Sequence, residues 1–379
     1  MSLTIVSYYA RTLIKLFIAL LFIYVLALVF KSPIKGAWEI AFPSKDPPNP
    51  VYGKLDPIEF VAMPTNGDVD SFELNTVDGK LPTAIPKNMK VYKYVPTFLS
   101  FEAGKIAQEA ALTLGFSELE IVSDYKADKF IWKDINTDAT LTVDLASQSI
   151  DMYTPLKNIA ANYEPGSIDE LTGKEMADEF FPKLGKFQDP LFSSGEKRTT
   201  LGRFVGERVV EAASTLEAQI VMFDYFRSIN EIPIMGPDPK QGMIRVVFGK
   251  PRIDNIKLIN PIVQVFENHI DQASEATYPV IPVAIAWQNI ARGNGVIASV
   301  IPSNKSPFEK YQRTNVDKVT IEKIYLGYYD SKFRQEYLQP IYVFEGRYTT
   351  GSGGKGAITL YYPAIDGKYV KGTTEEEDK

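Results

Sequence analysis

The chain has 379 residues, of which 45% are hydrophobic and 23% are charged, so its composition is that of a globular protein rather than a disordered one. Its formal net charge of −6 argues against a general nucleic-acid binder, which needs a basic face to neutralise phosphates. It contains no Cys and a single His, His269, which excludes disulfides, thiolate-ligated metals and any site with two imidazoles.

Residues 13–30 form an apolar run with one charge, Lys15. A helix of this length spans ~27 Å, close to the ~30 Å hydrocarbon core of a bilayer. The segment from Lys31 to Ala37 lacks the small-residue cleavage pattern of a signal peptide. We therefore expect a retained transmembrane anchor, with a cleaved signal peptide and a buried core helix as alternatives. Positive charges flank both ends of this run almost equally, so they hardly discriminate between the two orientations in the membrane. We expect the N-terminus on the cytoplasmic side and the large domain on the outer side.

Four prolines between Phe42 and Pro50 predict an extended, semi-rigid stalk. Beyond it, strand-like alternation and helical spacing take turns along the chain. The expected organisation is an N-terminal cytoplasmic segment at 1–12, the transmembrane anchor at 13–30, the Pro-rich stalk at 31–50, a small strand-rich module at 51–95, three α+β modules at 96–163, 164–275 and 276–370, and an acidic tail at 371–379.

The first α+β module is predicted as a helix followed by an antiparallel meander. Apolar residues recur at helical spacing over 102–116, where Gly115 ends the helix. Three short alternating runs follow at 129–133, 139–145 and 149–153, separated by polar turns.

The second module repeats this pattern with insertions. The sequence Thr-Gly-Lys-Glu at 172–175 fits a capping box that opens a helix. A long strand is expected at 218–227, a turn at 232–237 and a returning strand at 243–249.

The third module is the clearest. A helix is expected at 283–293, with Ile285, Trp287 and Ile290 needing cover. It should lie across an antiparallel sheet of strands at 318–329, 338–346 and 357–363. A change of apolar parity between Ile321 and Ile324 predicts a bulge near Glu322-Lys323, and Pro340 is expected at a strand start or edge.

A strand that ends in Leu326-Gly327-Tyr328-Tyr329, followed by Leu-Gln-Pro-Ile-Tyr-Val-Phe-Glu-Gly at 338–346, comes after a helix with small apolar residues. This arrangement resembles a PepSY-like module, as in membrane-anchored bacterial regulatory proteins of the YycH and YycI type. The resemblance is best over 280–365 and fainter over 101–155. It implies a non-enzymatic role in regulating or assembling an envelope partner. The predicted fold class is α+β, with an N-terminal transmembrane helix and then repeated helix-plus-antiparallel-meander (PepSY-like) modules.

Two motifs suggest chemistry but fit a simpler interpretation better. Gly351–Gly356 resembles a phosphate loop, yet a strand pattern follows Lys355 where a Walker A motif requires a helix, so a hairpin tip is favoured. Glu267, His269 and Asp271 would share one face of a strand and could form a weak metal or acid–base cluster. A single solvated His is the favoured interpretation, because no second imidazole exists.

Asp134, Asn136 and Asp138 alternate as in a calcium loop, but Ala139 and Leu145 stand where an EF-hand needs Gly and Glu, so an Asx-type turn is favoured. Asn304-Lys305-Ser306 is a glycosylation sequon that matters only in a eukaryotic secretory protein. Several tyrosines near the C-terminus are interpreted as cross-strand packing, with an outer face for a protein or glycan as the alternative. They are Tyr325, Tyr328, Tyr329, Tyr342, Tyr348, Tyr361, Tyr362 and Tyr369.

The predicted function is that of a single-pass membrane-anchored, extracytoplasmic binding or regulatory protein. It would contact a protein partner in the cell envelope, be anchored in the membrane by residues 13–30 and bind no nucleic acid. One alternative is a structural subunit of a pilus or secretion apparatus. Another is a membrane-tethered glycan-processing enzyme with paired carboxylates, which needs neither Cys nor His. No catalytic, cofactor-binding or metal-ligating residue is assigned, and the binding residues and oligomeric state stay open.

Overall fold

The computed structural model describes Phe17 and residues 48–122, 128–185, 189–309, 311–331 and 335–372. The chain divides into two units, Met1–Pro47 and Pro48–Lys379, and the fold described below is that of the second. The predicted anchor apart from Phe17, the stalk up to residue 47 and the tail from residue 373 lie outside the described residues. Within those residues, no helix is both long enough and apolar enough to cross a membrane.

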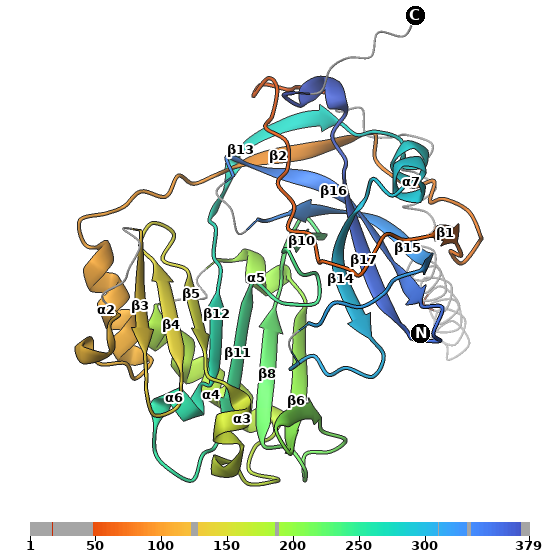
Figure 1. The fold of residues 1–379 in the computed structure, drawn as a ribbon. Helices are drawn as coiled ribbons and strands as arrows, with labels where there is room; N and C mark the ends of the chain where they lie inside the picture. Colours follow the sequence, from red (N-terminus) through yellow and green to blue (C-terminus); the bar gives the residue numbers. More distant parts are fainter. Residues whose placement is uncertain are drawn as a thin grey trace, which may run out of the picture. The chain divides into compact units, whose positions relative to one another are not determined.

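Seventeen strands in the described part of the chain form two sheets (Figure 1). One sheet has eight strands and is antiparallel throughout. Its strands, in spatial order, are β3 (Lys129–Lys133), β4 (Thr140–Asp144), β5 (Ile150–Tyr153), β12 (Ile262–Val265), β11 (Ile244–Gly249), β8 (Ile220–Tyr225), β6 (Lys197–Val205) and β7 (Arg208–Glu211).

The other sheet has nine strands and mixes parallel with antiparallel pairs. Its main path is β13 (Ile270–Pro279), β2 (Asn88–Tyr94), β16 (Tyr337–Thr349), β15 (Lys318–Tyr329), β10 (Ile232–Met235) and β9 (Arg227–Ile229). Off this path, β17 (Lys355–Pro363) pairs with β16 and with β14 (Val296–Pro302), and β1 (Ser71–Leu74) runs parallel to β15.

The helices of the described residues are short. The longest are α2 (Ala103–Thr113), α4 (Glu170–Leu184) and α7 (Val283–Ala291). Single-turn helices are α3 (Leu156–Ile159), α5 (Leu191–Ser194) and α6 (Ile256–Ile259), and 3₁₀ turns are η1 (Glu118–Glu120), η2 (Ala160–Asn162) and η3 (Gly367–Tyr369).

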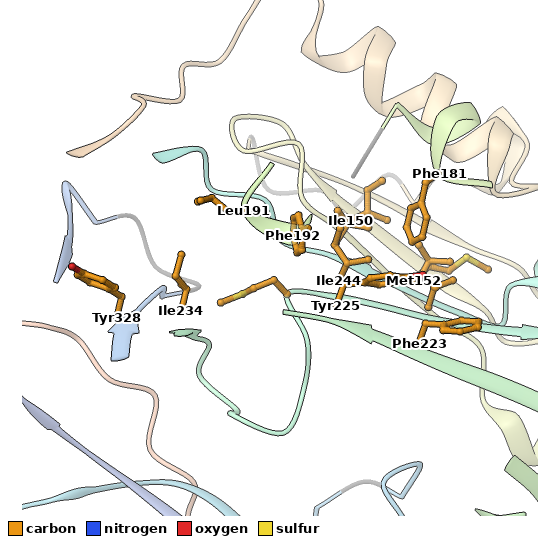
Figure 2. Packing of buried hydrophobic residues seen from close by; sticks show 14 of the residues in the cluster. Ile150, Met152, Phe181, Leu191, Phe192, Phe223, Tyr225, Ile234, Ile244 and Tyr328 are labelled. Carbon is orange, nitrogen blue, oxygen red and sulfur yellow. The ribbon is translucent and has the colours of Figure 1, made fainter. Parts of the chain in front are cut away.

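Both faces of the eight-stranded sheet are covered at β8, where every residue is buried. Successive side chains of a strand point to opposite faces, so Phe223 lies in the main core near α4 while Met222 joins a second cluster. The ring of Phe181 from α4 packs edge-on against Tyr225, with centroids 5.6 Å apart (Figure 2). A strand covered on both faces carries apolar residues without alternation, which explains the apolar run over 220–223 in this strand.

The predicted fold class is wrong. Repeated modules require each helix to be followed by strands that pair among themselves, but the strands of the chain instead enter two large sheets. The predicted second module, 164–275, is divided between them, because β8 and β11 belong to one sheet while β9 and β10 belong to the other. The first meander is also not a separate unit, because β5 continues into the rest of its sheet by pairing with β12.

Several local expectations are confirmed. β3, β4 and β5 form the predicted meander, and β15, β16 and β17 pair in the predicted order. The register of β15 against β16 shifts between Ile321 and Lys323, at the expected bulge. Pro340, expected at a strand start or edge, is instead the fourth residue of β16 and pairs with Tyr328 of β15; on its other side it lies between the part of β16 that pairs with β2 and the part that pairs with β17.

Two details of the expected helices are wrong. Helix α4 is capped by the side chain of Asp169, which accepts from the Thr172 amide at 2.7 Å, so the helix begins before the predicted capping box. In α7, Ile290 and Ala286 are buried, but Ile285 keeps 45% of its surface exposed. The covered stripe of this helix is narrower than its sequence predicts.

Candidate functional site

The chain passes from one sheet to the other between β2 and β3 and at three further places. Phe226 separates β8 from β9, residues 236–243 join β10 to β11, and residues 266–269 join β12 to β13. Backbone groups that leave their ladders at such crossings need other partners, and side chains provide some of them, as Asp224 does for the Gly242 amide. The polar side chains that line the candidate site belong to the last two of these connections and to the residues directly after β15.

Arg227, the first residue of β9, is the centre of a buried charge cluster. Its Nη1 donates to Asp189 Oδ2 at 2.9 Å and to the carbonyl oxygen of Asn268 at 2.7 Å, and its Nη2 donates to Asp330 Oδ2. The side chains of Arg227, Asp189 and Asp330 are 0%, 6% and 1% exposed. One guanidinium therefore faces two carboxylates inside the protein, which is tolerable because each charge is both paired and hydrogen-bonded.

Both carboxylate oxygens of Asp330 accept hydrogen bonds. Oδ1 accepts from the Tyr94 hydroxyl at 3.0 Å and from Asn268 Nδ2 at 2.8 Å, while Oδ2 accepts from Arg227. Burial raises the pKa of Asp330, although Arg227 and the hydrogen-bond donors oppose it. Burial and the charge of Asp330 also raise the pKa of Tyr94 well above its ordinary value, so this phenol remains a donor at neutral pH.

A cavity of about 260 Å³ lies beside this cluster. Asp330, Ser331 and Asn268 line it, together with Asp238 from the connection between β10 and β11. The other walls are mostly apolar and come from four separate segments. Their main apolar side chains are Val61, Met63, Pro237, Met243, Phe266 and Ala298.

The wall formed by residues 236–243 is held to β8 by a buried ion pair. Asp224 binds Arg245 through both oxygens, at 2.7 and 2.9 Å, and its Oδ1 also accepts from the Gly242 amide at 2.9 Å. A Cβ atom at residue 242 would lie 2.6 Å from the nitrogen of Tyr225. Only Gly therefore allows the loop to pass this close to the strand.

Residues 61–63 form another wall and cross the nine-stranded sheet as an extended strap. The Met63 amide donates to the carbonyl oxygen of Ile297 at 2.7 Å, and the Val61 amide donates to the Tyr329 hydroxyl at 3.2 Å. Ala62 lies between these two fixed points and is exposed. Hydrogen bonds thus hold two walls of the cavity in place without a ligand, as expected for a preformed site.

The predicted cluster of Glu267, His269 and Asp271 does not form a shared strand face. Strand β13 begins only at Ile270, and Glu267 is buried whereas His269 and Asp271 are exposed. In the described part of the chain, no group of three His, Asp or Glu side chains is arranged to hold a metal ion. The neighbour that does reach the candidate site is Asn268.

The favoured interpretations of the other motifs hold. Asp134 accepts from the Thr137 amide at 3.0 Å and closes a turn between β3 and β4, as an Asx-type turn does. Gly351–Gly356 lies at the hairpin between β16 and β17, where the Thr350 amide donates to Gly354 at 2.8 Å. Asn304 is exposed in the turn that follows β14.

The C-terminal tyrosines mainly serve packing, as the favoured interpretation predicts. Those that are at most 2% exposed are Tyr328, Tyr329, Tyr342, Tyr348 and Tyr361. The ring centroids of Tyr329 and Tyr361 lie 5.7 Å apart, in an edge-on arrangement. Tyr325, Tyr362 and Tyr369 are half-buried. These rings therefore do not form the outer binding face considered as the alternative.

The residues of the cavity carry no recognisable motif in the sequence. Asp330, Asn268 and Asp238 lie in three separate connections, so no motif spacing relates them. One signal was present: Arg227 ends a mostly apolar stretch, 218–227, which also contains Asp224. Arg is almost never fully buried unless it is paired, so a charge in such a run indicates a buried partner elsewhere in the chain.

Comparisons with known proteins add little to this geometry. No family model matches the chain, and a search of curated proteins finds no match. Among solved structures, the chain is similar to an uncharacterized protein from Eubacterium rectale, with 11% identity and a TM-score of 0.42, over 79% of this chain and 90% of that chain. The resemblance to PepSY-like modules is not tested by these comparisons and stays a prediction.

Proposed function

We propose that this protein is a non-catalytic binding protein whose ligand enters the cavity beside Asp330. The observation that carries the proposal is the cavity itself, with mostly apolar walls and few polar groups. This composition is typical of ligand sites, in which apolar surface provides affinity and a few polar groups fix orientation. At about 260 Å³, the cavity suits a small molecule or one protruding side chain rather than a drug-sized ligand.

Binding is favoured over catalysis by the state of the carboxylates. A glycan-processing pair needs one carboxyl group that gives a proton to the substrate and another that faces water or the sugar. Asp330 already accepts on both oxygens, from Tyr94, Asn268 and Arg227. Its hydrogen bonds therefore support a fixed electrostatic role over the exchange of a proton with a substrate.

The wider biological role stays a prediction from sequence. Regulation of a protein partner in the cell envelope is the preferred role, and a structural subunit of a surface assembly is the alternative. A cavity that accepts a single protruding side chain is compatible with the preferred role, because partner side chains often anchor in such pockets.

The proposal is tested by blocking the cavity. Ala62 is an exposed wall residue, so Ala62→Trp should fill the entrance while the fold is retained. With n-pentanol and n-pentylammonium as probes, calorimetry on the full chain should detect binding of at least one of them, and Ala62→Trp should abolish it. Ala84→Trp, at an exposed position outside the cavity lining, is the matched control. Binding that survives Ala62→Trp would place the ligand elsewhere and reject the proposal.

A further inference from the structure

The described lining of the cavity consists of apolar, neutral polar and acidic side chains. Among the described residues that line it, the charged ones are Asp238 and Asp330, and none is Lys or Arg. Basic side chains on the flanking elements already have acidic partners: Arg245 binds Asp224, and Lys240 lies 3.5 Å from Glu345. Within the described lining, an anionic group would therefore meet two carboxylates and no basic side chain.

The buried cluster behind the cavity is also short of positive charge. Arg227 is a single cation, and it faces both Asp189 and Asp330. When both carboxylates are ionised, these three side chains together carry one excess negative charge, and all three are buried. A cation placed in the cavity next to Asp330 would compensate this excess, because charge interactions strengthen as the local dielectric constant falls.

The hydrogen-bonding groups of the cavity favour the same ligand. The carboxylate of Asp238 provides acceptors, and the Gly242 amide, a donor in the same loop, is already bound to Asp224. The side-chain nitrogen of Asn268 already donates to Asp330 Oδ1 and to the Ser331 carbonyl oxygen. The site therefore offers mainly acceptors to a ligand that brings donors, as an ammonium or guanidinium group does.

We infer that the cavity binds the ammonium or guanidinium end of a ligand, with a short apolar stem packed against Met63, Met243 and Phe266. This inference rests on the proposed binding function and names its ligand class. If each non-hydrogen atom with its hydrogens occupies roughly 30 Å³, as a water molecule does, a cavity of about 260 Å³ holds a ligand of up to about nine such atoms. Two sources fit that size: a small free amine, or a Lys or Arg side chain of a partner protein.

The charge preference is tested with three probes of nearly equal size and different charge. These are n-pentylammonium, n-pentanol and pentanoate, titrated into the full chain by calorimetry. We expect n-pentylammonium to bind at least about tenfold more tightly than n-pentanol, and pentanoate to bind most weakly. If n-pentanol binds as tightly as n-pentylammonium and Ala62→Trp blocks both, the inference fails while the proposed function stands. If no probe binds, both fail.

A variant that removes one lining charge tests whether the preference for a cation arises in this cavity. Asp238→Asn removes one lining charge without touching the buried Arg227 cluster, and it should weaken n-pentylammonium about tenfold while changing n-pentanol less than twofold. Asp254→Asn makes the same change at an exposed position outside the lining and should leave both affinities unchanged. Unaltered n-pentylammonium affinity in Asp238→Asn would overturn the inference.

The two sources are separated by capped tripeptides. Acetyl-Gly-Lys-Gly-amide is compared with the same peptide in which norleucine replaces Lys. Tighter binding of the Lys peptide than of n-pentylammonium assigns the site to a partner side chain, and the reverse order assigns it to a free amine. Equal binding of the Lys and norleucine peptides would contradict a cation site, whichever source supplied it.

Discussion

Arg227 and Asp330 are 103 residues apart in the sequence and form an ion pair in which both side chains are almost completely buried. Arg227 begins β9 and Asp330 follows β15, and β10 pairs with both strands. The pair therefore stabilises the crossing from β8 to β9, where the chain leaves the eight-stranded sheet and joins the nine-stranded one. It is also part of the buried charge cluster beside the cavity, and Asp330 lines that cavity.

Removal of Arg227 should strongly destabilise the protein. In Arg227→Met, Asp189 and Asp330 would lose their shared cation and remain buried, so we expect the free energy of unfolding to fall by about 3–5 kcal/mol. Arg252→Met is the matched control, because Arg252 and Glu164 form an ion pair whose side chains are 61% and 60% exposed. Such a surface pair contributes about 0–1 kcal/mol. Equal losses in the two variants, measured by denaturant unfolding, would contradict the role given to Arg227.

The sequence predicts much of the local structure, because its signals are local. The bulge near Glu322 follows from a change in the parity of apolar residues, and parity is a property of one strand. The hairpin at Gly351–Gly356 follows from turn composition between two strand patterns. The break at Phe226 has no such signal, since residues 222–229 contain no Gly, Pro or Asn that would indicate a turn.

The sheet arrangement depends on pairings between distant segments. β2 pairs with β13, and β10 joins the edge of β15, although long stretches of chain separate the partners. The alternation of apolar and polar residues predicts that a strand has an apolar face, but it does not indicate which strand lies beside it. The candidate site is hidden for the same reason, because Asp238, Asn268 and Asp330 meet only after these pairings form.

The same Gly-to-Ala change should have opposite effects in two helices. In α2, a Cβ atom at Gly104 would lie 3.4 Å from the ring of Phe130, an ordinary contact, so Gly104→Ala should stabilise by about 0.5–1 kcal/mol through helix propensity. In α4, a Cβ atom at Gly173 would overlap Val221 and lie 3.0 Å from Phe223. Gly173→Ala should therefore destabilise by about 1–3 kcal/mol through overpacking. Thermal unfolding of both variants tests the pair, and stabilisation by Gly173→Ala would show that α4 does not approach β8 this closely.

Helix α7 provides a test of the covered stripe. Ile290 is completely buried, so Ile290→Ala should lower the free energy of unfolding by about 2–5 kcal/mol. Ile285 is 45% exposed in the same helix, and Ile285→Ala should change it by less than about 1 kcal/mol. Denaturant unfolding of the two variants compares identical substitutions at two positions of one helix. A larger loss for Ile285 than for Ile290 would mean that the helix is rotated relative to this structure.

Buried tyrosines should make the fold sensitive to alkaline pH. Burial raises the pKa of Tyr342 from 10.0 to about 12, and its hydroxyl donates to the Ile281 carbonyl oxygen at 2.6 Å. Between these two pKa values the unfolded chain releases the phenolic proton while the folded chain retains it, so a rise in pH favours unfolding. The stabilising contribution is fully present below about pH 10 and is lost progressively toward about pH 12, at about 1.4 kcal/mol per pH unit for each such group.

Substitution of Tyr342 isolates this contribution. Tyr342→Phe should be less stable than the natural chain by about 1 kcal/mol near neutral pH, because it lacks the hydrogen bond to Ile281. The difference should shrink, and then change sign, as the pH rises from about 9 to about 11.5, since the variant has no phenol to ionise at this position. Urea unfolding across that range measures both curves, and the ultraviolet absorbance of tyrosinate reports when the phenols ionise. Parallel curves would show that Tyr342 ionises equally easily in the folded and unfolded chains, contrary to its burial at the centre of β16.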